Sequence, residues 1–246
     1  MTSQQTEQIT GGDLVAQALE AAGVETVFGI ISIHNLPIYD AIGRNGVIRA
    51  ITNRSEPGAV NMADGYARAT SKLGVAITST GTGAGNAAGA LIEAQVAGTP
   101  LLHLTGQIDS AFLDQGRGYI HEARDQFGML KAISKEAYRV RTAAALPSVI
   151  QAAIRSALTP PMGVVSVEIP IDFQKAKINP ARLDLLPPPT PTPDAGQVAW
   201  ATQLLRSARR PLIWAGSGVI ASNAEKELTE LAEMLGAAVL TSQAGR

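Results

Sequence analysis

The amino-acid sequence predicts an α/β protein, in which a six-stranded parallel sheet carries helices on both faces and is followed by a shorter α/β segment. Short apolar runs alternate with longer helix-like segments along most of the chain, and this alternation is typical of a parallel sheet. Most of the apolar runs lack polar alternation, as expected for strands covered on both faces. Hydrophobic residues make up 46% of the 246 residues and charged residues 17%, so a globular core is expected.

The individual elements follow in chain order from this alternation. Strands are expected at six apolar runs, 26–30, 47–52, 75–80, 101–106, 136–140 and 164–170. Helices are expected in the segments that precede or separate them, 13–22, 36–44, 56–70, 85–96, 124–133 and 146–158. Because a helix separates each strand from the next, consecutive strands are expected to run parallel.

A proline-rich stretch then interrupts the pattern. Residues 178–197 hold six of the fourteen prolines and no periodic apolar face, which is typical of an extended linker. The alternation restarts with helices at 198–207 and 224–235 and strands at 211–216 and 237–242. We therefore expect a first domain over 1–180, a Pro-rich linker over 181–198 and a truncated second domain over 199–246, because two strands and two helices cannot close a core of their own.

Composition excludes several classes of protein and site. The chain has no cysteine and a formal net charge of −1, so disulfides and thiolate chemistry are excluded and a nucleic-acid-binding surface is not expected. The histidines, His34, His103 and His121, are far apart in the sequence, and no metal site is expected from them. No apolar stretch approaches the roughly 20 residues of a membrane helix, and the polar N-terminus does not resemble a signal peptide. We expect a cytoplasmic protein.

Two stretches carry the candidate chemistry. The first is NRSEPGAVNMADGYARAT at 53–70, where a predicted strand ends and a helix begins, and the second is the Gly-rich turn TSTGTGAGNAAGA at 78–90. Together they resemble the first-domain signature of thiamine-diphosphate-dependent enzymes of the acetolactate synthase and benzaldehyde lyase type. The resemblance covers the whole chain: 9–30 is similar to benzaldehyde lyase, and PLLHLTGQ and GVVSVEIPIDF match later strands of the family.

The resemblance implies that Glu56 is the cofactor-activating residue. In this family a carboxylate bonded to N1′ of the aminopyrimidine favours the tautomer that removes the thiazolium C2 proton, and a buried apolar setting would suit a carboxyl group that shares a proton. Without the motif, Glu56 would be read as a helix-start acid that complements the helix dipole. The chain departs from the family at Ser55, where the family often has His.

Further site residues are implied by position. His34 matches an active-site histidine of benzaldehyde lyase, although it also suits ordinary capping of a strand-to-helix loop, and an imidazole there could move protons. His121 falls where benzaldehyde lyase has an active-site Gln, with Glu122 as a rival, and Gln115 is a further substrate-side candidate. His103, inside an apolar strand, is expected to be a core residue.

The Gly-rich turn is implied to bind the cofactor. Thr80, Gly81 and Asn86 belong to the turn that approaches the aminopyrimidine in this family, and glycine permits close backbone contact. The same turn also fits a dinucleotide-binding pattern through Gly83, Gly85 and Ala88. That pattern is weak alone, and it normally follows the first strand of its domain.

The resemblance also implies cofactors and partners. It implies thiamine diphosphate with Mg²⁺, the metal being held mainly by a C-terminal domain through a G-D-G…N motif that 1–246 does not contain. The second segment would be part of a Rossmann-like central domain, in which FAD is possible but not indicated. We expect C–C bond cleavage or formation on 2-oxo acids, aldehydes or acyloins by a homodimer or homotetramer with sites at subunit interfaces. The 246-residue chain by itself is expected to be inactive.

Two other functions stay open from the sequence. The chain could be a non-catalytic cofactor-binding or dimerisation module, because the diphosphate-binding motif is missing from it. The weaker alternative is a nicotinamide dinucleotide-binding oxidoreductase. It rests on the G-x-G-x-x-A pattern above, with Asp109 downstream of it, and on a second such pattern at Gly216, Gly218 and Ala221.

Overall fold

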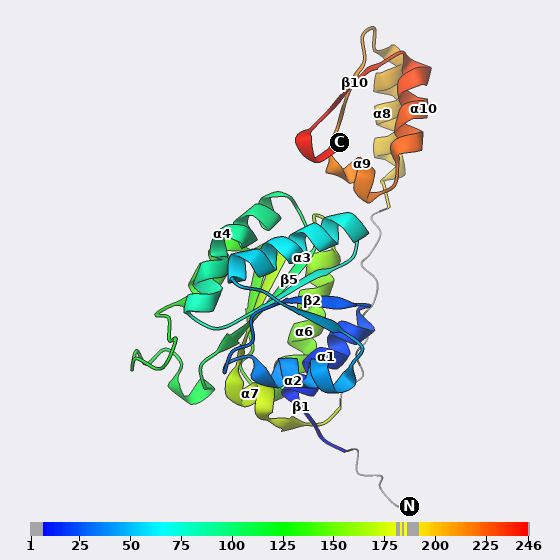
Figure 1. The fold of residues 1–246 in the computed structure, drawn as a ribbon. Coiled ribbons are helices and arrows are strands. Elements are labelled where there is room, and N and C mark those ends of the chain that lie inside the picture. Colours follow the sequence, from blue (N-terminus) through cyan, green and yellow to red (C-terminus); the bar gives the residue numbers. More distant parts are fainter. Residues whose placement is uncertain (1–6, 181–182, 184, 186–191, 246) are drawn as a thin grey trace, which may run out of the picture. The chain divides into compact units, whose positions relative to one another are not determined.

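A computed structural model describes residues 7–180, 183, 185 and 192–245. The chain divides into two compact units, Met1–Pro188 and Pro189–Arg246. The first unit contains a six-stranded sheet of order β3-β2-β4-β5-β7-β6, in which every neighbouring pair is parallel (Figure 1). The predicted fold class is therefore confirmed.

The elements of this unit lie close to the predicted ranges. The strands are β2 (Thr26–Gly29), β3 (Arg49–Thr52), β4 (Gly74–Thr78), β5 (Leu101–Gln107), β6 (Glu136–Arg139) and β7 (Val164–Pro170). The helices are α1 (Gly11–Ala21), α2 (Leu36–Asn45), α3 (Glu56–Thr70), α4 (Thr82–Val96), α5 (Gln126–Ile133) and α6 (Leu146–Leu158), with short 3₁₀ turns η1 (Ser110–Phe112) and η2 (Ala143–Ala145). The largest difference is at α4, which begins three residues earlier than predicted. Strand β4 ends two residues early because Ser79 and Thr80 leave the sheet to form the turn before α4.

The helices cover the two faces of the sheet in two groups. Large aliphatic side chains of α1, α2 and α6 pack on one face against alternate strand residues such as Leu102 and Leu104. Alanines of α3 and α4 pack on the other face against Ala76, Leu101 and Val164. Figure 1 shows α3 and α4 on the opposite side of the sheet from α1, α2 and α6.

Besides η1 and η2, three short elements of the first unit were not predicted. β1 (Ile9–Thr10) pairs antiparallel with β8 (Lys177–Ile178), and α7 (Ile171–Lys175) follows β7 directly. Two-residue strands and a one-turn helix are too short to produce a periodic signal in the sequence.

The second unit contains α8 (Ala195–Ser207), β9 (Leu212–Ala215), α9 (Ser217–Ala221), α10 (Glu225–Leu235), β10 (Ala238–Thr241) and η3 (Gln243–Gly245), with β9 and β10 parallel. Helix α8 begins earlier than predicted because the Asp194 side chain accepts a hydrogen bond from Gln197 N at 2.8 Å and caps it. The last residues of the predicted linker are therefore helical, and 181–182, 184 and 186–191 lie outside the described residues. No helix in the described part of the chain is long and apolar enough to cross a membrane.

Candidate active site

The candidate catalytic carboxylate lies at the start of a helix and is held by a residue of the neighbouring helix. Glu56 is the first residue of α3, and Ser55 caps this helix by accepting a hydrogen bond from Gly58 N at 3.3 Å. Asn86 of α4 donates from Nδ2 to Glu56 Oε2 at 3.3 Å. The structure thus brings together two residues that the sequence places thirty positions apart.

A glycine keeps space beside this carboxylate. A Cβ atom at Gly83 would lie 2.8 Å from Ser79 Cβ and 3.3 Å from Glu56 Oε1, which is too close for a side chain there. Glu56 is half-buried in this chain rather than fully buried. The absence of a side chain at Gly83 therefore lets Glu56 and Ser79 pack closely against the first turn of α4.

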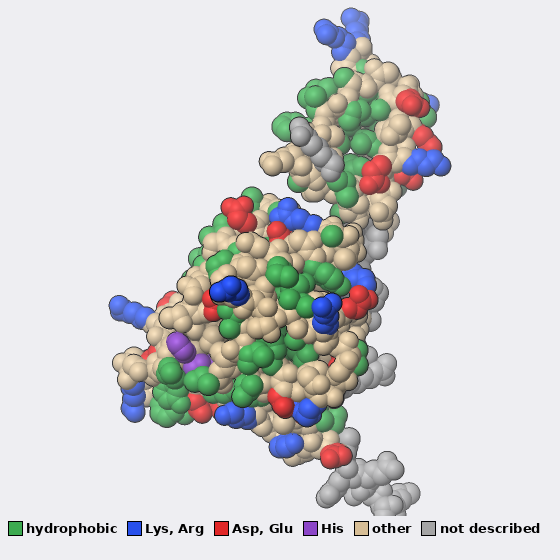
Figure 2. Space-filling model, viewed as in Figure 1, with side chains coloured by type: hydrophobic (Ala, Val, Ile, Leu, Met, Phe, Trp, Pro, Cys, Tyr) green, Lys and Arg blue, Asp and Glu red, His purple; other side chains and the backbone are tan. Residues whose placement is uncertain are grey.

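Two histidines meet on the other side of the same turn. The rings of His34 and His121 pack edge to face, with their centroids 5.8 Å apart, and Thr82 Oγ1 lies 3.2 Å from His121 Nδ1. His121 is exposed, has a positive φ of 63°, and Figure 2 shows histidine reaching the surface of the first unit beside hydrophobic side chains. His34 is 2% exposed, and its Nδ1 has no hydrogen-bond partner among the described residues. Burial, together with the electrostatic effects of His121 and Lys175, lowers the pKa of His34, which favours the neutral imidazole.

Two glutamines accept hydrogen bonds from the Gly-rich turn and hold it in place. Thr80 is fully buried, and its Oγ1 lies 2.9 Å from Gln126 Oε1 and 3.1 Å from Gln107 Oε1. Gly81 has φ 56° and donates its N–H to Gln126 Oε1 at 2.6 Å. A Cβ at Gly81 would overlap with the carbonyl oxygen of His121, so only glycine allows this contact between the turn and the 110–125 segment.

Sequence reasoning missed the polar network behind this turn. Gln126 and Gln107 both donate from Nε2 to Glu168 Oε2, at 3.0 and 3.3 Å, and Arg139 Nε donates to Glu168 Oε1. Glu168 is completely buried. The available signal was the set of polar residues inside otherwise apolar strands, because a buried charge needs a partner elsewhere in the fold.

Two other predicted residues lie apart from Glu56. Gln115 is exposed and donates from Nε2 to Ala111 O at 2.5 Å, within its own segment. His103 is completely buried, with Thr78 Oγ1 at 2.9 Å from Nε2 and Ser166 Oγ at 3.1 Å from Nδ1. The prediction that His103 is a satisfied core residue is confirmed.

Comparison with known proteins agrees with this geometry. Residues 9–129 match the N-terminal TPP binding domain of thiamine pyrophosphate enzymes, and residues 198–246 match the central domain of the same enzymes. The chain belongs to the thiamine pyrophosphate enzyme family. It is 34% identical over 244 residues to an acetolactate synthase of Mycobacterium bovis, covering 98% of this chain and 39% of that relative. An acetolactate synthase large subunit of Corynebacterium glutamicum is 34% identical over 242 residues, covering 96% of this chain and 38% of the relative.

A solved structure supports the same family. The thiamine diphosphate-dependent 4-hydroxybenzoylformate decarboxylase of Rhodococcus jostii RHA1 superposes with a TM-score of 0.86 at 27% identity, covering 95% of this chain and 44% of that chain. The chain therefore spans less than half the length of these thiamine pyrophosphate enzymes.

Membership of the thiamine pyrophosphate enzyme family also accounts for the glycine pattern. Gly83 and Gly85 lie inside the first turn of α4, after a central strand of the sheet. Asp109, which could have been read as the acidic partner of a dinucleotide site, caps η1 by accepting from Ala111 N at 3.1 Å. The dinucleotide interpretation has no support in this arrangement.

Proposed function

We propose that this chain is part of an enzyme that cleaves or forms a C–C bond next to a carbonyl group in 2-oxo acids, aldehydes or acyloins, with thiamine diphosphate as cofactor. The observation that carries the proposal is the Glu56–Asn86 pair, with Glu56 packed closely against Gly83 in the first turn of α4. Membership of the thiamine pyrophosphate enzyme family gives this pair a chemical meaning. Decarboxylation and carboligation are both within this reaction class.

The residues present fit the aminopyrimidine end of the cofactor. When bound, thiamine diphosphate supplies the nucleophilic carbon for the bond-breaking or bond-making step. Glu56 offers a half-buried carboxylate, Asn86 orients it, and the turn at Thr80 and Gly81 offers backbone that a ligand can approach closely. We propose that Glu56, Thr80, Gly81 and Asn86 bind the cofactor.

The chain's own proton chemistry rests on three side chains. Glu56 would hold or give up a proton at its carboxylate while Asn86 keeps Oε2 in place, which is a general acid–base role. Burial lowers the pKa of His34 and favours its neutral form, and its Nδ1 has no partner among the described residues, so it would accept a proton or a hydrogen bond from a substrate. We propose that His121 contacts substrate from the same side, because its ring packs on His34.

Gln115 is a weaker candidate for the substrate side. It lies in the 110–125 segment that also carries His121, but its amide is bonded to Ala111 O within that segment. We propose that it reaches a substrate only after this bond opens.

We also propose that the enzyme is a homodimer or homotetramer in which α3 and α4 face a second copy. These helices pack against each other, and a Cβ at Gly65, Gly85 or Gly89 would meet no described atom within 4 Å. Glycine inside a helix costs roughly 0.5–1 kcal/mol relative to alanine, and no packing within the described chain requires these three. Met62, Ile92 and Val96 add exposed apolar area to the same two helices.

The metal and the diphosphate would be bound elsewhere. Among the described residues, no group of three or more His, Asp or Glu side chains is placed to hold a metal ion. We propose that Mg²⁺ and the diphosphate are held by a domain beyond these 246 residues and that the chain by itself has no turnover. Robust catalysis by the chain alone would overturn that proposal.

The test of the proposed function is Glu56→Gln in the full-length protein that carries this chain. Loss of the carboxylate should slow C2-proton exchange of bound thiamine diphosphate by two or more orders of magnitude, roughly the contribution of a positioned acid–base group. NMR-detected hydrogen–deuterium exchange after acid quench measures it. The matched control is Glu93→Gln, an exposed glutamate of α4, which should leave the rate unchanged. An unchanged rate in Glu56→Gln would rule out the assignment.

A further inference from the structure

The buried carboxylate of Glu168 lies behind the Gly-rich turn without contacting it directly. It is 0% exposed on β7, and its two oxygens face different partners. Oε2 accepts from Gln126 Nε2 at 3.0 Å and from Gln107 Nε2 at 3.3 Å, and Oε1 accepts from Arg139 Nε. All these partners come from elements that are far from Glu168 in the sequence.

The hydrogen-bonding chemistry of Glu168 determines how the side-chain amides of Gln126 and Gln107 are oriented. An ionised carboxylate only accepts hydrogen bonds, so both amides must turn their NH₂ groups toward it. Their carbonyl oxygens then face the turn, where Gln126 Oε1 accepts from Gly81 N at 2.6 Å. Gln107 Oε1 and Gln126 Oε1 both accept from Thr80 Oγ1. A neutral amide at position 168 would remove this constraint, because an amide can present either a donor or an acceptor.

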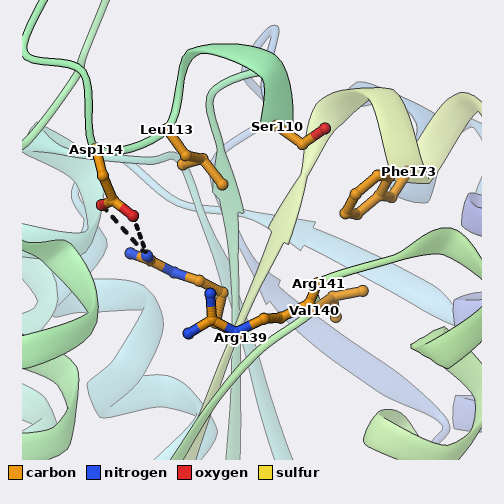
Figure 3. Close-up of a pocket in the computed structure, with 7 residues that line it drawn as sticks. All are labelled: Ser110, Leu113, Asp114, Arg139, Val140, Arg141 and Phe173. Carbon is orange, nitrogen blue, oxygen red and sulfur yellow. Dashed lines mark hydrogen bonds and ion pairs between the residues drawn. The ribbon is translucent and has the colours of Figure 1, made fainter.

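The second oxygen of Glu168 leads to the segment that carries Gln115 and His121. Arg139 binds Glu168 through Nε and Asp114 through Nη1, the latter at 3.1 Å. Figure 3 shows Arg139 reaching from β6 toward Asp114 along the wall of a cavity of about 340 Å³. Asp114 has a positive φ of 61°, so the segment is anchored where its backbone is strained.

We propose that Glu168 is a positioning residue that fixes two segments of the site proposed for the aminopyrimidine of the cofactor. Through Gln126 and Gln107 it holds the turn at Thr80 and Gly81. Through Arg139 and Asp114 it anchors the segment that bears Gln115 and His121. The effect of Glu168 on cofactor binding rests on the function proposed above. Its effect on the position of the turn at Thr80 and Gly81 does not depend on that function.

The hold on the turn can be measured in the 246-residue chain. Glu168→Gln keeps the shape of the side chain and removes the charge, so the Gln126 amide is free to rotate and Gly81 N loses its fixed acceptor. Amide hydrogen exchange at Gly81, read by NMR, should accelerate about tenfold or more, the amount expected when one hydrogen bond is lost. Gln126→Ala removes the acceptor without disturbing the ion pair and should give the same acceleration, which keeps the test valid if Glu168→Gln does not fold.

Exchanging the amide at position 126 and the carboxylate at position 168 tests whether the protection of the Gly81 amide can be restored. In the double variant Gln126→Glu/Glu168→Gln, a carboxylate faces Gly81 N and an amide faces the carboxylate. Part of the protection of the Gly81 amide from exchange should return. If Glu168→Gln acted only by disrupting the fold, the second substitution would not restore this protection. The matched control is Ser166→Ala, since Ser166 lies two residues away on the same strand face but bonds His103 and Ser134 instead. Exchange at Gly81 that is the same in Glu168→Gln as in Ser166→Ala would overturn the inference.

The functional part is measured in the full-length protein with thiamine diphosphate and Mg²⁺ as probes. Glu168→Gln should raise the KM for the cofactor about tenfold, with a smaller loss in kcat, and the swap should recover part of it while Ser166→Ala changes neither. An unchanged KM alongside faster Gly81 exchange would overturn the role in cofactor positioning. A wild-type protein that does not bind thiamine diphosphate would instead overturn the proposed function, and the Gly81 result would then stand separately.

Discussion

The two faces of the six-stranded sheet are built from the same strands but differ in chemistry. Toward α1, α2 and α6, strands β5 and β7 present Leu102, Leu104, Val165 and Val167, all completely buried. Toward α3, α4 and α5, the same strands begin with Leu101 and Val164 and then turn polar. The polar side chains on that face are His103, Thr105 and Gln107 of β5 and Ser166 and Glu168 of β7.

The difference shows how one sheet separates stability from chemistry. Successive side chains of a strand point to opposite faces, so a run can be apolar on one face and polar on the other. The polar face changes character toward the carboxyl ends of the strands, which is where open α/β sheets bind ligands. Its helices pack through alanines, which lets their N-termini approach the sheet closely. The apolar face therefore carries most of the core, and the other face carries the candidate site.

The largest effect on stability should come from a large-to-small substitution on the apolar face of the sheet. Leu104→Ala removes a completely buried side chain and should lower the free energy of unfolding of the first unit by about 2–5 kcal/mol. Urea titration followed by far-UV circular dichroism measures it, and fluorescence of Trp200 and Trp214, both in the second unit, follows that unit separately. Local exchange at Gly81 under native conditions should stay near the wild-type value. Selective loosening of the turn by Leu104→Ala would contradict the separation of the two faces.

An intermediate effect should appear in the pH dependence of the polar face. Burial lowers the pKa of His103 from 6.5 to about 3, so the folded chain keeps this ring neutral while the unfolded chain takes up a proton below 6.5. The free energy of unfolding should therefore fall as the pH drops from 6.5 toward 3, by at most about 1.4 kcal/mol per pH unit from this residue.

Two variants isolate this contribution. His103→Gln removes the titrating group and should reduce the slope of the stability profile between pH 6.5 and 4, measured by urea titration at each pH. His34, whose pKa is also lowered, accounts for part of the slope that remains. The exposed His121→Gln should change the slope much less than His103→Gln does. If the slope disappeared in His121→Gln and persisted in His103→Gln, the pH dependence would come from His121 and not from His103.

The smallest effect concerns the glycines on the outer side of α4. Gly85→Ala and Gly89→Ala should each stabilise the chain by about 0.4–1 kcal/mol, since alanine favours the helix and both positions have room for a Cβ. Both changes should weaken self-association, measured by sedimentation velocity over a range of concentrations. The control is Gly43→Ala on α2, which also has room for a Cβ and should stabilise the chain without changing self-association. Equal effects of all three on self-association would remove α4 from the proposed interface.

Much of the fold could be predicted because it depends on local patterns. Helix α6 spans the predicted residues 146–158, and α3 begins at Glu56 as predicted, since each combines an apolar period with a proline in its first turn. The ends of β4 and α4 were shifted by the turn at Ser79–Gly81. The positive φ of Gly81 is set by contacts with distant residues, and the local sequence does not reveal it.

The candidate site divides in the same way. The sequence by itself determined the order of strands and helices and the Gly-rich turn, and the family motif led to the proposal that Glu56 is the central residue. Only the tertiary structure decided that Asn86 binds Glu56, that His34 meets His121, and that Glu168 controls the turn through Gln126. These contacts join residues 30 to 87 positions apart. Periodicity reports which face a residue occupies, whereas hydrogen bonds between separate elements depend on how the chain packs.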